Sequence, residues 1–381
     1  MKKNLKILYA TAFFQGMVFY APVATLYRKA AGVNVWQIAL IESISLALAL
    51  LLEIPWGAAA ERIGYRRTLI LCNVLFFASK IIFWRAEGFA LFLAERILLS
   101  VVISGISGVD TSILYLSCSQ ANSRKAFGLY SVCGQAGLLF ATIVFSLCIG
   151  KNYRLAGLLT VVSYGISALL TFCLQEVRQP EKQSAPTILC VLRRTMHNKN
   201  LLIFLISCVL LSETHQTLTV FLSQLQYEKS GMSAAAMGGA YLLVTLAGFS
   251  AALSDQLAKR LGTARLAALC FLLAAAACAV LAITANAFLS VGCIVLLRLA
   301  ASVFSPLQSQ LQNEQITDVN RASALSVQSV FMASIGCVTN LAFGRAAEGN
   351  IRFAMTLACS CCIAALLLFM LWCKALAKIK R

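Results

Sequence analysis

Hydrophobic runs of about 20 residues alternate with short polar turns along almost the whole chain. A helix that crosses about 30 Å of hydrocarbon at 1.5 Å per residue needs roughly 20 apolar residues. The pattern therefore predicts an all-α membrane protein with twelve transmembrane helices. The predicted spans are residues 5–27, 35–58, 68–85, 89–116, 126–149, 155–175, 200–223, 234–254, 265–285, 287–310, 322–343 and 351–373.

One long polar stretch divides these spans into two sets of six. It covers residues 176–199 and contains Pro180, Pro186 and several cations. We interpret it as a cytoplasmic linker between an N-terminal bundle at residues 1–175 and a C-terminal bundle at residues 200–381. The other connections are too short to hold a catalytic domain.

The placement of Lys and Arg predicts the orientation of the chain, because cytoplasmic loops hold the excess of these residues. Of the 32 cations, roughly 21 fall on the side that holds both termini and roughly nine on the other side. Both termini are therefore expected in the cytoplasm. The basic N-terminus precedes a long apolar run without a small-residue cleavage site, which favours a first span over a cleaved signal peptide. Short outer loops and the absence of N-x-[ST] sequons favour a bacterial inner membrane.

Composition excludes most other classes of protein. Hydrophobic residues make up 60% of the chain and charged residues 12%, the net charge is +18, and the mean hydropathy is +0.83. A soluble domain has about a quarter charged residues, so a soluble enzyme and a disordered tail are excluded. The cations lie between hydrophobic runs and not on one folded face, so no nucleic-acid partner is expected.

The 15 cysteines do not indicate a metal or redox site. Most lie singly inside apolar runs, where cysteine behaves as a small hydrophobic residue. The tightest group, Cys359, Cys361 and Cys362, lacks zinc or redox spacing. We predict no metal and no cofactor, and neither a Walker loop nor a nucleophile–base pair suggests an enzyme.

The two halves of the chain resemble each other weakly. Residues 26–32 (LYRKAAG) end the first span and lead to Asn34, and residues 226–231 (QYEKSG) end the seventh and lead to Ser233. Asn34 and Ser233 are helix N-cap residue types, and Gln37 would complete a capping box. The fourth and tenth spans share Arg96 and Arg298. A duplication of six helices is typical of transporters.

Residues 57–67 (GAAAERIGYRR), between the second and third spans, resemble the G-x-x-x-D-R-x-G-R-R signature of the major facilitator superfamily. Glu61 replaces the aspartate, and Tyr65 is inserted before the paired arginines. The second half has a more decayed copy that keeps Asp255. This resemblance implies two pseudo-symmetric six-helix bundles that transport a small molecule by alternating access, with a monomer as the usual state.

This loop is predicted to act as a gate latch. Gly57 permits close helix packing, Glu61 can pair at the helix end, and the arginines can anchor to anionic lipid headgroups and to the facing half. The alternative is a basic loop that only sets the topology. The gate residues are Gly57, Glu61, Arg62, Gly64, Arg66, Arg67 and Asp255.

Ionisable residues inside a span are costly, so each is a hypothesis of a functional site. The proton-coupling candidates are Glu42, Glu53, Arg96, Asp110, Glu213 and His215. Arg96 matches the arginine of the superfamily's fourth-span R-x-x-x-G pattern, which is linked to proton coupling in drug antiporters, although Ser100 replaces the glycine. Alternatively, Arg96 forms a buried ion pair with Glu42, Glu53 or Asp110. Lys80 is expected to extend to the outer interface.

The seventh span is unusually polar at mid-membrane, so part of it should face water or substrate. Gln216 and Thr217 are cavity candidates there, together with Arg298 of the tenth span. In the first span, Gln15 and Tyr20 lie near Gly16 and Pro22, which suggest a discontinuous helix. Interhelical hydrogen bonding is the alternative role for these residues.

The sequence therefore predicts a secondary active transporter of a small organic molecule. Proton-coupled export of an amphiphilic or drug-like compound is the favoured form, because the chain resembles compact twelve-span drug exporters. The fifth span lacks the G-P-x-x-G-G antiporter signature, which counts against this form. Uptake of a nutrient and lipid flipping are alternatives, and a non-transporting receptor with the same fold is a third. The expected partners are the substrate, protons and membrane lipids.

Overall fold

The computed structural model describes residues 2–107, 109–118, 123–177, 198–315 and 321–379. Most of the linker expected at residues 176–199 lies outside this part. The described side chains exclude those of residues 2, 53, 54, 57, 58, 60, 61, 123–125, 313, 321–326 and 376–379. Every regular element in the described part is a helix, and twelve helical segments are long and apolar enough to cross a membrane.

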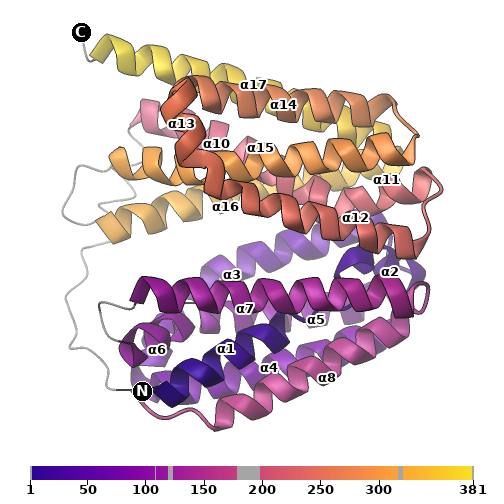
Figure 1. Cartoon of the computed structure of the whole chain (residues 1–381), viewed down its shortest axis with the longest axis vertical. Helices are drawn as coiled ribbons and strands as arrows, with labels where there is room; N and C mark the ends of the chain where they lie inside the picture. Colours follow the sequence, from indigo (N-terminus) through magenta and orange to yellow (C-terminus); the bar gives the residue numbers. More distant parts are fainter. Residues whose placement is uncertain (1, 108, 119–122, 178–197, 316–320, 380–381) are drawn as a thin grey trace. The chain divides into compact units, whose positions relative to one another are not determined.

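The chain forms two compact units (Figure 1). The first consists of Met1–Lys182 with Ser233–Leu242, and the second of Gln183–Met232 with Leu243–Arg381. The helices from the N-terminus to residue 172 are α1 (Lys2–Gly16), η1 (Ala21–Val23), α2 (Ala24–Ala30), α3 (Val35–Ile63), α4 (Tyr65–Arg85), α5 (Gly88–Ile106), α6 (Val109–Ser117), α7 (Ser123–Val144), η3 (Phe145–Ile149) and α8 (Tyr153–Phe172).

The helices after residue 198 follow a similar order. They are α10 (Lys199–Thr217), η4 (Leu218–Leu222), α11 (Ser223–Lys229), α12 (Ala234–Ala247), η5 (Gly248–Leu253), α13 (Ser254–Leu261), α14 (Thr263–Ile283), α15 (Ala287–Glu314), α16 (Arg321–Gly349) and α17 (Ile351–Ile379). Several helices run past the predicted spans, because hydropathy marks only the apolar stretch and a helix can continue into the interface. Conversely, α8 ends at Phe172, before residue 175, where the sixth span was predicted to end.

Helix packing repeats from one half of the chain to the other. In the first unit, α1 packs on α7 and α8, and α4 packs on α5 and α8. The corresponding contacts of the second unit join α10 to α16 and α17, and α14 to α15 and α17. The contact of α3 with α5 corresponds to that of η5 with α15. The internal duplication inferred from weak sequence similarity is therefore visible as one packing scheme used twice.

Local signals fix several helix ends as predicted. The backbone N–H of Asn34 donates to Oε1 of Gln37 at 3.0 Å, and the N–H of Gln37 donates to Oδ1 of Asn34 at 2.8 Å, which is the expected capping box. Ser233 accepts from the N–H of Ala236. The first span is broken after Gly16, as its glycine and proline suggested.

A glycine in the left-handed region separates two helices at the same place in each half. Gly64 lies between α3 and α4 with a φ of 95°, and Gly262 lies between α13 and α14 with a φ of 82°. An L side chain rarely adopts this conformation, so glycine allows the chain to turn sharply here. The signature loop and its decayed copy thus share a backbone geometry.

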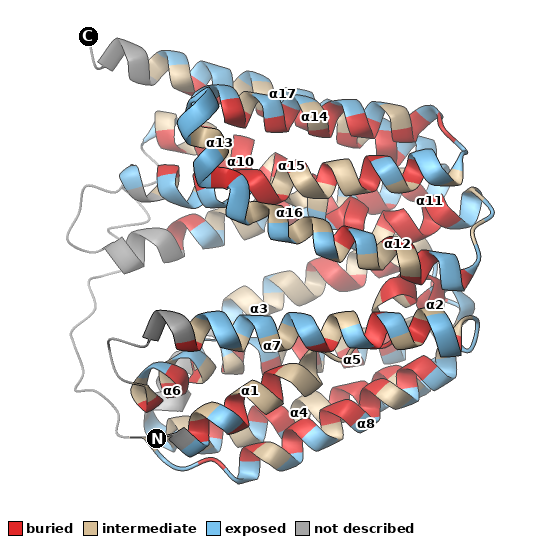
Figure 2. Ribbon diagram, in the orientation of Figure 1, coloured by how far each residue is buried: buried red, intermediate tan, exposed pale blue. Residues whose placement is uncertain are grey.

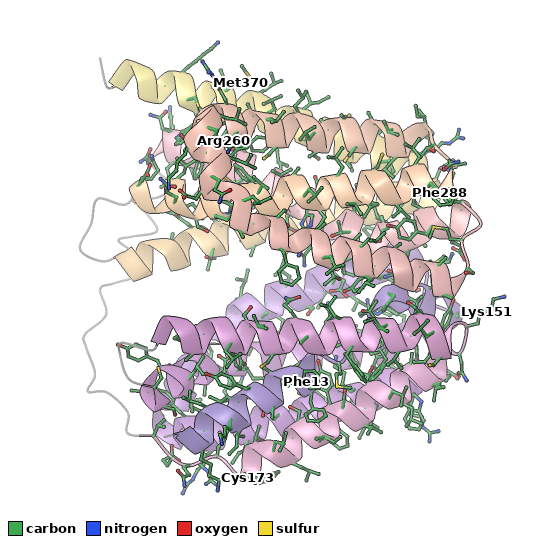
Figure 3. All side chains as sticks on the ribbon, in the orientation of Figure 1. Phe13, Lys151, Cys173, Arg260, Phe288 and Met370 are labelled. Carbon is green, nitrogen blue, oxygen red and sulfur yellow. The ribbon has the colours of Figure 1, made fainter. Side chains whose placement is uncertain are left out.

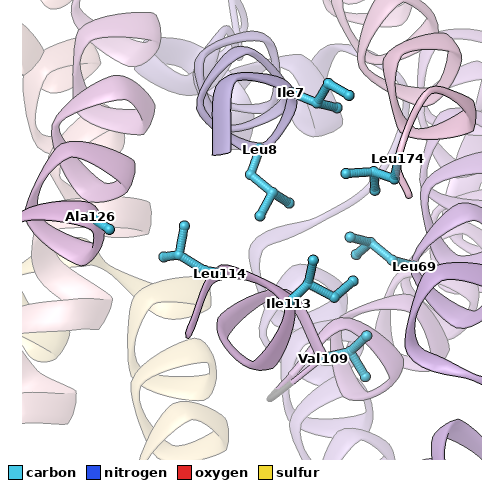
Figure 4. Packing of buried hydrophobic residues seen from close by; sticks show 8 residues of the cluster. All are labelled: Ile7, Leu8, Leu69, Val109, Ile113, Leu114, Ala126 and Leu174. Carbon is cyan, nitrogen blue, oxygen red and sulfur yellow. The ribbon is translucent and has the colours of Figure 1, made fainter. Parts of the chain in front are cut away.

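Both units contain buried and exposed residues along their helices (Figure 2), and many of the residues in each class are large and apolar. A cluster in the first unit joins α1, α4, α6, α7 and the segment after α8 (Figure 4). Its buried members are Ile7, Leu8, Leu69, Val109, Ile113, Leu114, Ala126 and Leu174. On the second unit, Phe288 and Met370 are exposed (Figure 3). Exposed apolar residues are expected where helices face lipid.

The crossing of α1 and α7 depends on the absence of side chains. A Cβ on Gly16 would overlap the carbonyl oxygen of Gly134, and a Cβ on Gly137 would overlap the carbonyl oxygen of Phe13. Small residues at helix crossings allow this close approach in membranes. We expect Gly137→Ala to lower the free energy of unfolding by about 1–3 kcal/mol, because the helices must move apart.

The measurement is thermal unfolding of the purified protein in detergent. Gly128→Ala on the same helix is the matched control, because no atom lies within 4 Å of the added Cβ. Equal unfolding temperatures for the two variants would contradict the proposed role of the crossing.

Candidate functional site

A cavity of about 450 Å³ lies within the second unit, between α10, η5, α15 and α16. Its lining is mixed, with polar side chains from α10 and α15 and several apolar ones. The described lining residues are Leu211, Ser212, His215, Gln216, Gly248, Ala251, Arg298, Ala301, Ser302, Phe304, Ser305, Gln308 and Met332. A volume of this size suits a small organic ligand.

His215 and Arg298 meet in this cavity. Nη1 of Arg298 lies 3.2 Å from Nε2 of His215. The guanidinium also lies against the backbone of η5, where a Cβ on Gly248 would come within 2.7 Å of Nη2. Gly248 therefore makes room for the arginine, and the packing of η5 on α15 holds it beside α10. The sequence pointed to both polar residues but not to Gly248.

The polar face of the seventh span is split between the cavity and a neighbouring helix. His215 and Gln216 line the cavity. The side chain of Glu213 instead packs on α16, where a Cβ on Gly336 would lie 2.9 Å from its Cδ. Thr217 also turns to α16 and donates a buried hydrogen bond to Asn340 at 2.7 Å. Neither Glu213 nor Thr217 is among the described lining residues. Of the expected cavity residues Gln216 and Thr217, only Gln216 reaches the cavity.

An ion cluster in the first unit is centred on Glu42. Its Oε1 accepts from Nη1 of Arg28 at 2.9 Å, and its Oε2 pairs with Nη2 of Arg96. All three side chains are largely buried, with 10%, 5% and 23% exposed for Glu42, Arg28 and Arg96. Of the ion pairs considered for Arg96, the structure contains the one with Glu42. Arg28, which follows the last residue of the predicted first span, is buried.

Lys80 does not extend to the interface, because its side chain is only 6% exposed. Its Nζ donates to the hydroxyl of Tyr20 at 3.2 Å and lies 3.8 Å from Oε1 of Glu95. The ammonium also lies over the rings of Phe76 and Tyr164, at 5.1 and 5.3 Å from their centroids. The expectation of an interfacial lysine is therefore wrong. The prediction used only the position of Lys80 along its own helix, which does not show that Glu95 of α5 faces Lys80.

The remaining candidates of the first unit make interhelical contacts. Nε2 of Gln15 donates to Oδ1 of Asn73 at 2.7 Å, and Tyr20 stacks on Phe83 with centroids 4.1 Å apart. Oδ2 of Asp110 accepts from the hydroxyl of Tyr130 at 3.0 Å. The structure thus gives Gln15 the hydrogen-bonding role that was the alternative. The side chain of Glu53 lies outside the described residues.

The predicted gate residues are only partly described. The side chain of Glu61 and the surroundings of Gly57 lie outside the described part, and Arg62 and Arg67 are exposed. Arg66 donates to the carbonyl oxygens of Leu174 and Phe172 at 2.5 and 3.1 Å, so it caps the end of α8 within its own unit. Asp255 forms an exposed pair with Lys259 at 2.6 Å.

No group of three or more metal-ligating side chains occurs among the described residues. The lining side chains of the cavity offer hydrogen bonding and, from Arg298, charge pairing.

Comparisons with known proteins agree with this architecture. A family model described as Major Facilitator Superfamily matches residues 7–340. A search of curated protein sequences gives no significant match. The solved structure of nucleoside transporter NupG superposes with a TM-score of 0.81 at 17% identity, covering 97% of this chain and 99% of that one. A bacterial homologue of the human lysosomal transporter Spinster, inward-facing and unoccupied, gives 0.75 at 15% identity over 98% and 96%. At these identities the likeness concerns the fold.

The Glu42 cluster generates a prediction about stability. Glu42→Gln would leave Arg28 and Arg96 buried next to each other without their anion. Breaking a buried ion pair in this way costs about 3–5 kcal/mol. We therefore expect a large drop in the unfolding temperature of the purified protein.

Glu87→Gln is the matched control, because Glu87 is 76% exposed and pairs with Arg154 at 2.8 Å. An exposed pair contributes about 0–1 kcal/mol. If both variants unfold at the same temperature, Glu42 does not hold the cluster together.

Proposed function

The chain belongs to the Major Facilitator Superfamily and is a transporter that works by alternating access, and from this premise we propose that it moves a small polar organic solute across the membrane, coupled to protons. The observation that carries this proposal is the lining of the cavity in the second unit. Gln216, Arg298 and Gln308 offer hydrogen-bond donors and acceptors there. Polar side chains inside a membrane protein are costly unless they serve a pathway or a binding site.

Proton coupling is proposed from His215. An imidazole can bind and release a proton, and histidines inside membrane spans take part in proton relays of transporters. Its position beside Arg298 places any such proton next to a fixed cation inside the cavity. Glu213, on the opposite side of α10 against Gly336, is a second proton-binding candidate.

Orientation and location are proposed from the sequence. The excess of Lys and Arg in the loops on one side supports cytoplasmic termini. We propose the bacterial inner membrane as the location, from the short outer loops, and a monomer as the working unit. The gate role of residues 57–67 also stays a proposal, to which the structure adds the capping of α8 by Arg66.

Export of an amphiphilic or drug-like compound is the second candidate function. Leu211, Phe304 and Met332 give the cavity an apolar part that would suit such a compound. We favour a polar solute, because serine, glutamine, histidine and arginine make up most of the rest of the lining.

Ligand-induced stabilisation followed by transport tests the proposal. We expect members of a panel of nucleosides, sugars, amino acids and small carboxylates to raise the unfolding temperature, and lipophilic dyes to leave it unchanged. A stabilising solute should then accumulate in proteoliposomes under an imposed pH gradient, and a protonophore should abolish the accumulation. Stabilisation by dyes alone would favour the second candidate.

Gln308→Leu gives the matching variant. Losing a hydrogen bond to the solute corresponds to about 1 kcal/mol, so KM should rise roughly fivefold. The control is Gln310→Leu on the same helix, because Gln310 is exposed and donates to Glu314 at 2.8 Å. An unchanged KM in Gln308→Leu would remove this residue from the solute site.

A further inference from the structure

A proline lies inside the helix that forms one wall of the cavity. Pro306 belongs to α15, and the cavity residues Ser302 and Ser305 precede it in the same helix. Proline has no backbone N–H, so it cannot donate to the carbonyl oxygen four residues earlier. The main-chain carbonyl of Ser302 therefore lacks its regular helical donor. A helical carbonyl points toward the next turn, which here contains Ser305, so this acceptor lies next to the cavity.

The next carbonyl along α15 has a donor from outside the helix. The hydroxyl of Ser254 donates to the carbonyl oxygen of Val303 at 2.8 Å in a buried contact. Serine side chains commonly satisfy backbone groups near a proline in membrane helices. Among the described residues, no side chain gives the same support to the carbonyl oxygen of Ser302. A backbone group without its helical partner is tolerated at membrane depth where it lines a cavity, so this carbonyl is available to a ligand there.

The polar side chains around this carbonyl can both donate and accept hydrogen bonds, because they end in hydroxyl or carboxamide groups. They are Gln216, Ser302, Ser305 and Gln308. Within the described part of the chain, none of these four side chains has a hydrogen-bond partner, so all are open to a ligand. The described lining contains no Asp or Glu. A ligand that only accepts would leave the Ser302 carbonyl and both amide oxygens without donors.

The spacing of these groups sets the size of the ligand. Ser302, Ser305 and Gln308 follow one another at intervals of three residues, so they share one face of α15 and extend over roughly 9 Å. A row of this length suits several hydroxyl groups on a ring or a short chain. The cavity volume of about 450 Å³ is sufficient for such a molecule. Leu211 and Phe304, also in the lining, can contact its carbon atoms.

We propose that the main-chain carbonyl of Ser302, released by Pro306, accepts a hydrogen bond from the solute, and that the solute is an uncharged polyhydroxy compound. The inference rests on the proposed transport through this cavity and specifies its substrate class and one group that determines specificity. Each solute hydroxyl can donate to a carbonyl or amide oxygen and accept from a serine or an amide. A compound without donors is rejected, because it would bury the Ser302 carbonyl unpaired.

The experiment measures binding of three named polyols to the natural protein in nanodiscs. D-ribose, D-glucose and myo-inositol are followed by saturation-transfer NMR, which detects weak binding and does not respond to general stabilisation by sugars. Triethylene glycol dimethyl ether is the matched control, because it offers a row of acceptor oxygens and no donor. We expect at least one polyol to bind and the ether not to bind. Replacing one hydroxyl of the bound polyol by fluorine, which cannot donate, should raise Kd about fivefold.

Pro306→Ala tests the carbonyl itself. The new N–H can donate to the carbonyl oxygen of Ser302 inside the helix, so the solute loses this acceptor. Losing one hydrogen bond corresponds to about 1 kcal/mol, so Kd for the bound polyol should rise roughly fivefold. The unfolding temperature should not fall, because alanine favours a helix over proline. Pro55→Ala is the control, since Pro55 lies inside α3 and is not among the described lining residues, and it should leave Kd unchanged.

The inference is overturned if none of the three polyols binds, if the ether binds equally well, if no fluorine replacement weakens binding, or if Pro306→Ala leaves Kd unchanged. Should Pro306→Ala fail to fold, the fluorinated analogues on the natural protein decide alone. These outcomes differ from failure of the proposed function. Transport of an amino acid or a carboxylate that Pro306→Ala does not affect would reject the polyhydroxy solute and keep the transporter. Polyol binding that depends on Pro306, without transport in proteoliposomes, would reject only the proposed transport route.

Discussion

The cost of placing a charge inside a membrane-spanning bundle is the constraint that organises this protein. Charged side chains there must pair with each other or face a cavity. The first unit meets this requirement with acid–base contacts between helices, in which Glu42 lies between Arg28 and Arg96 and Glu95 faces Lys80. These contacts tie the first four spans together in addition to their apolar packing.

The second unit uses the same packing scheme but a different charge arrangement. Its tenth span carries Arg298, as the fourth carries Arg96. Arg96 pairs with a carboxylate in a packed interface, whereas Arg298 lies beside a histidine in a cavity. Duplication thus produced two halves with one helix arrangement and unequal electrostatics. The charges of the first unit hold its helices together, and we propose a ligand-binding role for Arg298.

Glycine positions determine how closely the helices can approach and hence which side chains meet. Gly16, Gly134 and Gly137 bring the backbones of α1 and α7 into contact, and Gly248 admits the guanidinium of Arg298 beside η5. In both places the absence of a side chain leaves room for a neighbouring group, which is a helix backbone in the first case and a guanidinium in the second. The first crossing holds the broken first span in place, and the second forms one wall of the cavity.

The sequence by itself determined the membrane class, the twelve spans, the internal duplication and the capping box at Asn34, because hydropathy and capping depend on residues close together in the chain. It also pointed to His215, Gln216 and Arg298. Only the tertiary structure decided that Lys80 is buried against Glu95, that Glu213 turns to α16, and that His215 meets Arg298. Such contacts depend on how far each helix is rotated about its axis, which is set by packing against its neighbours and leaves little trace in the spacing of residues along one helix.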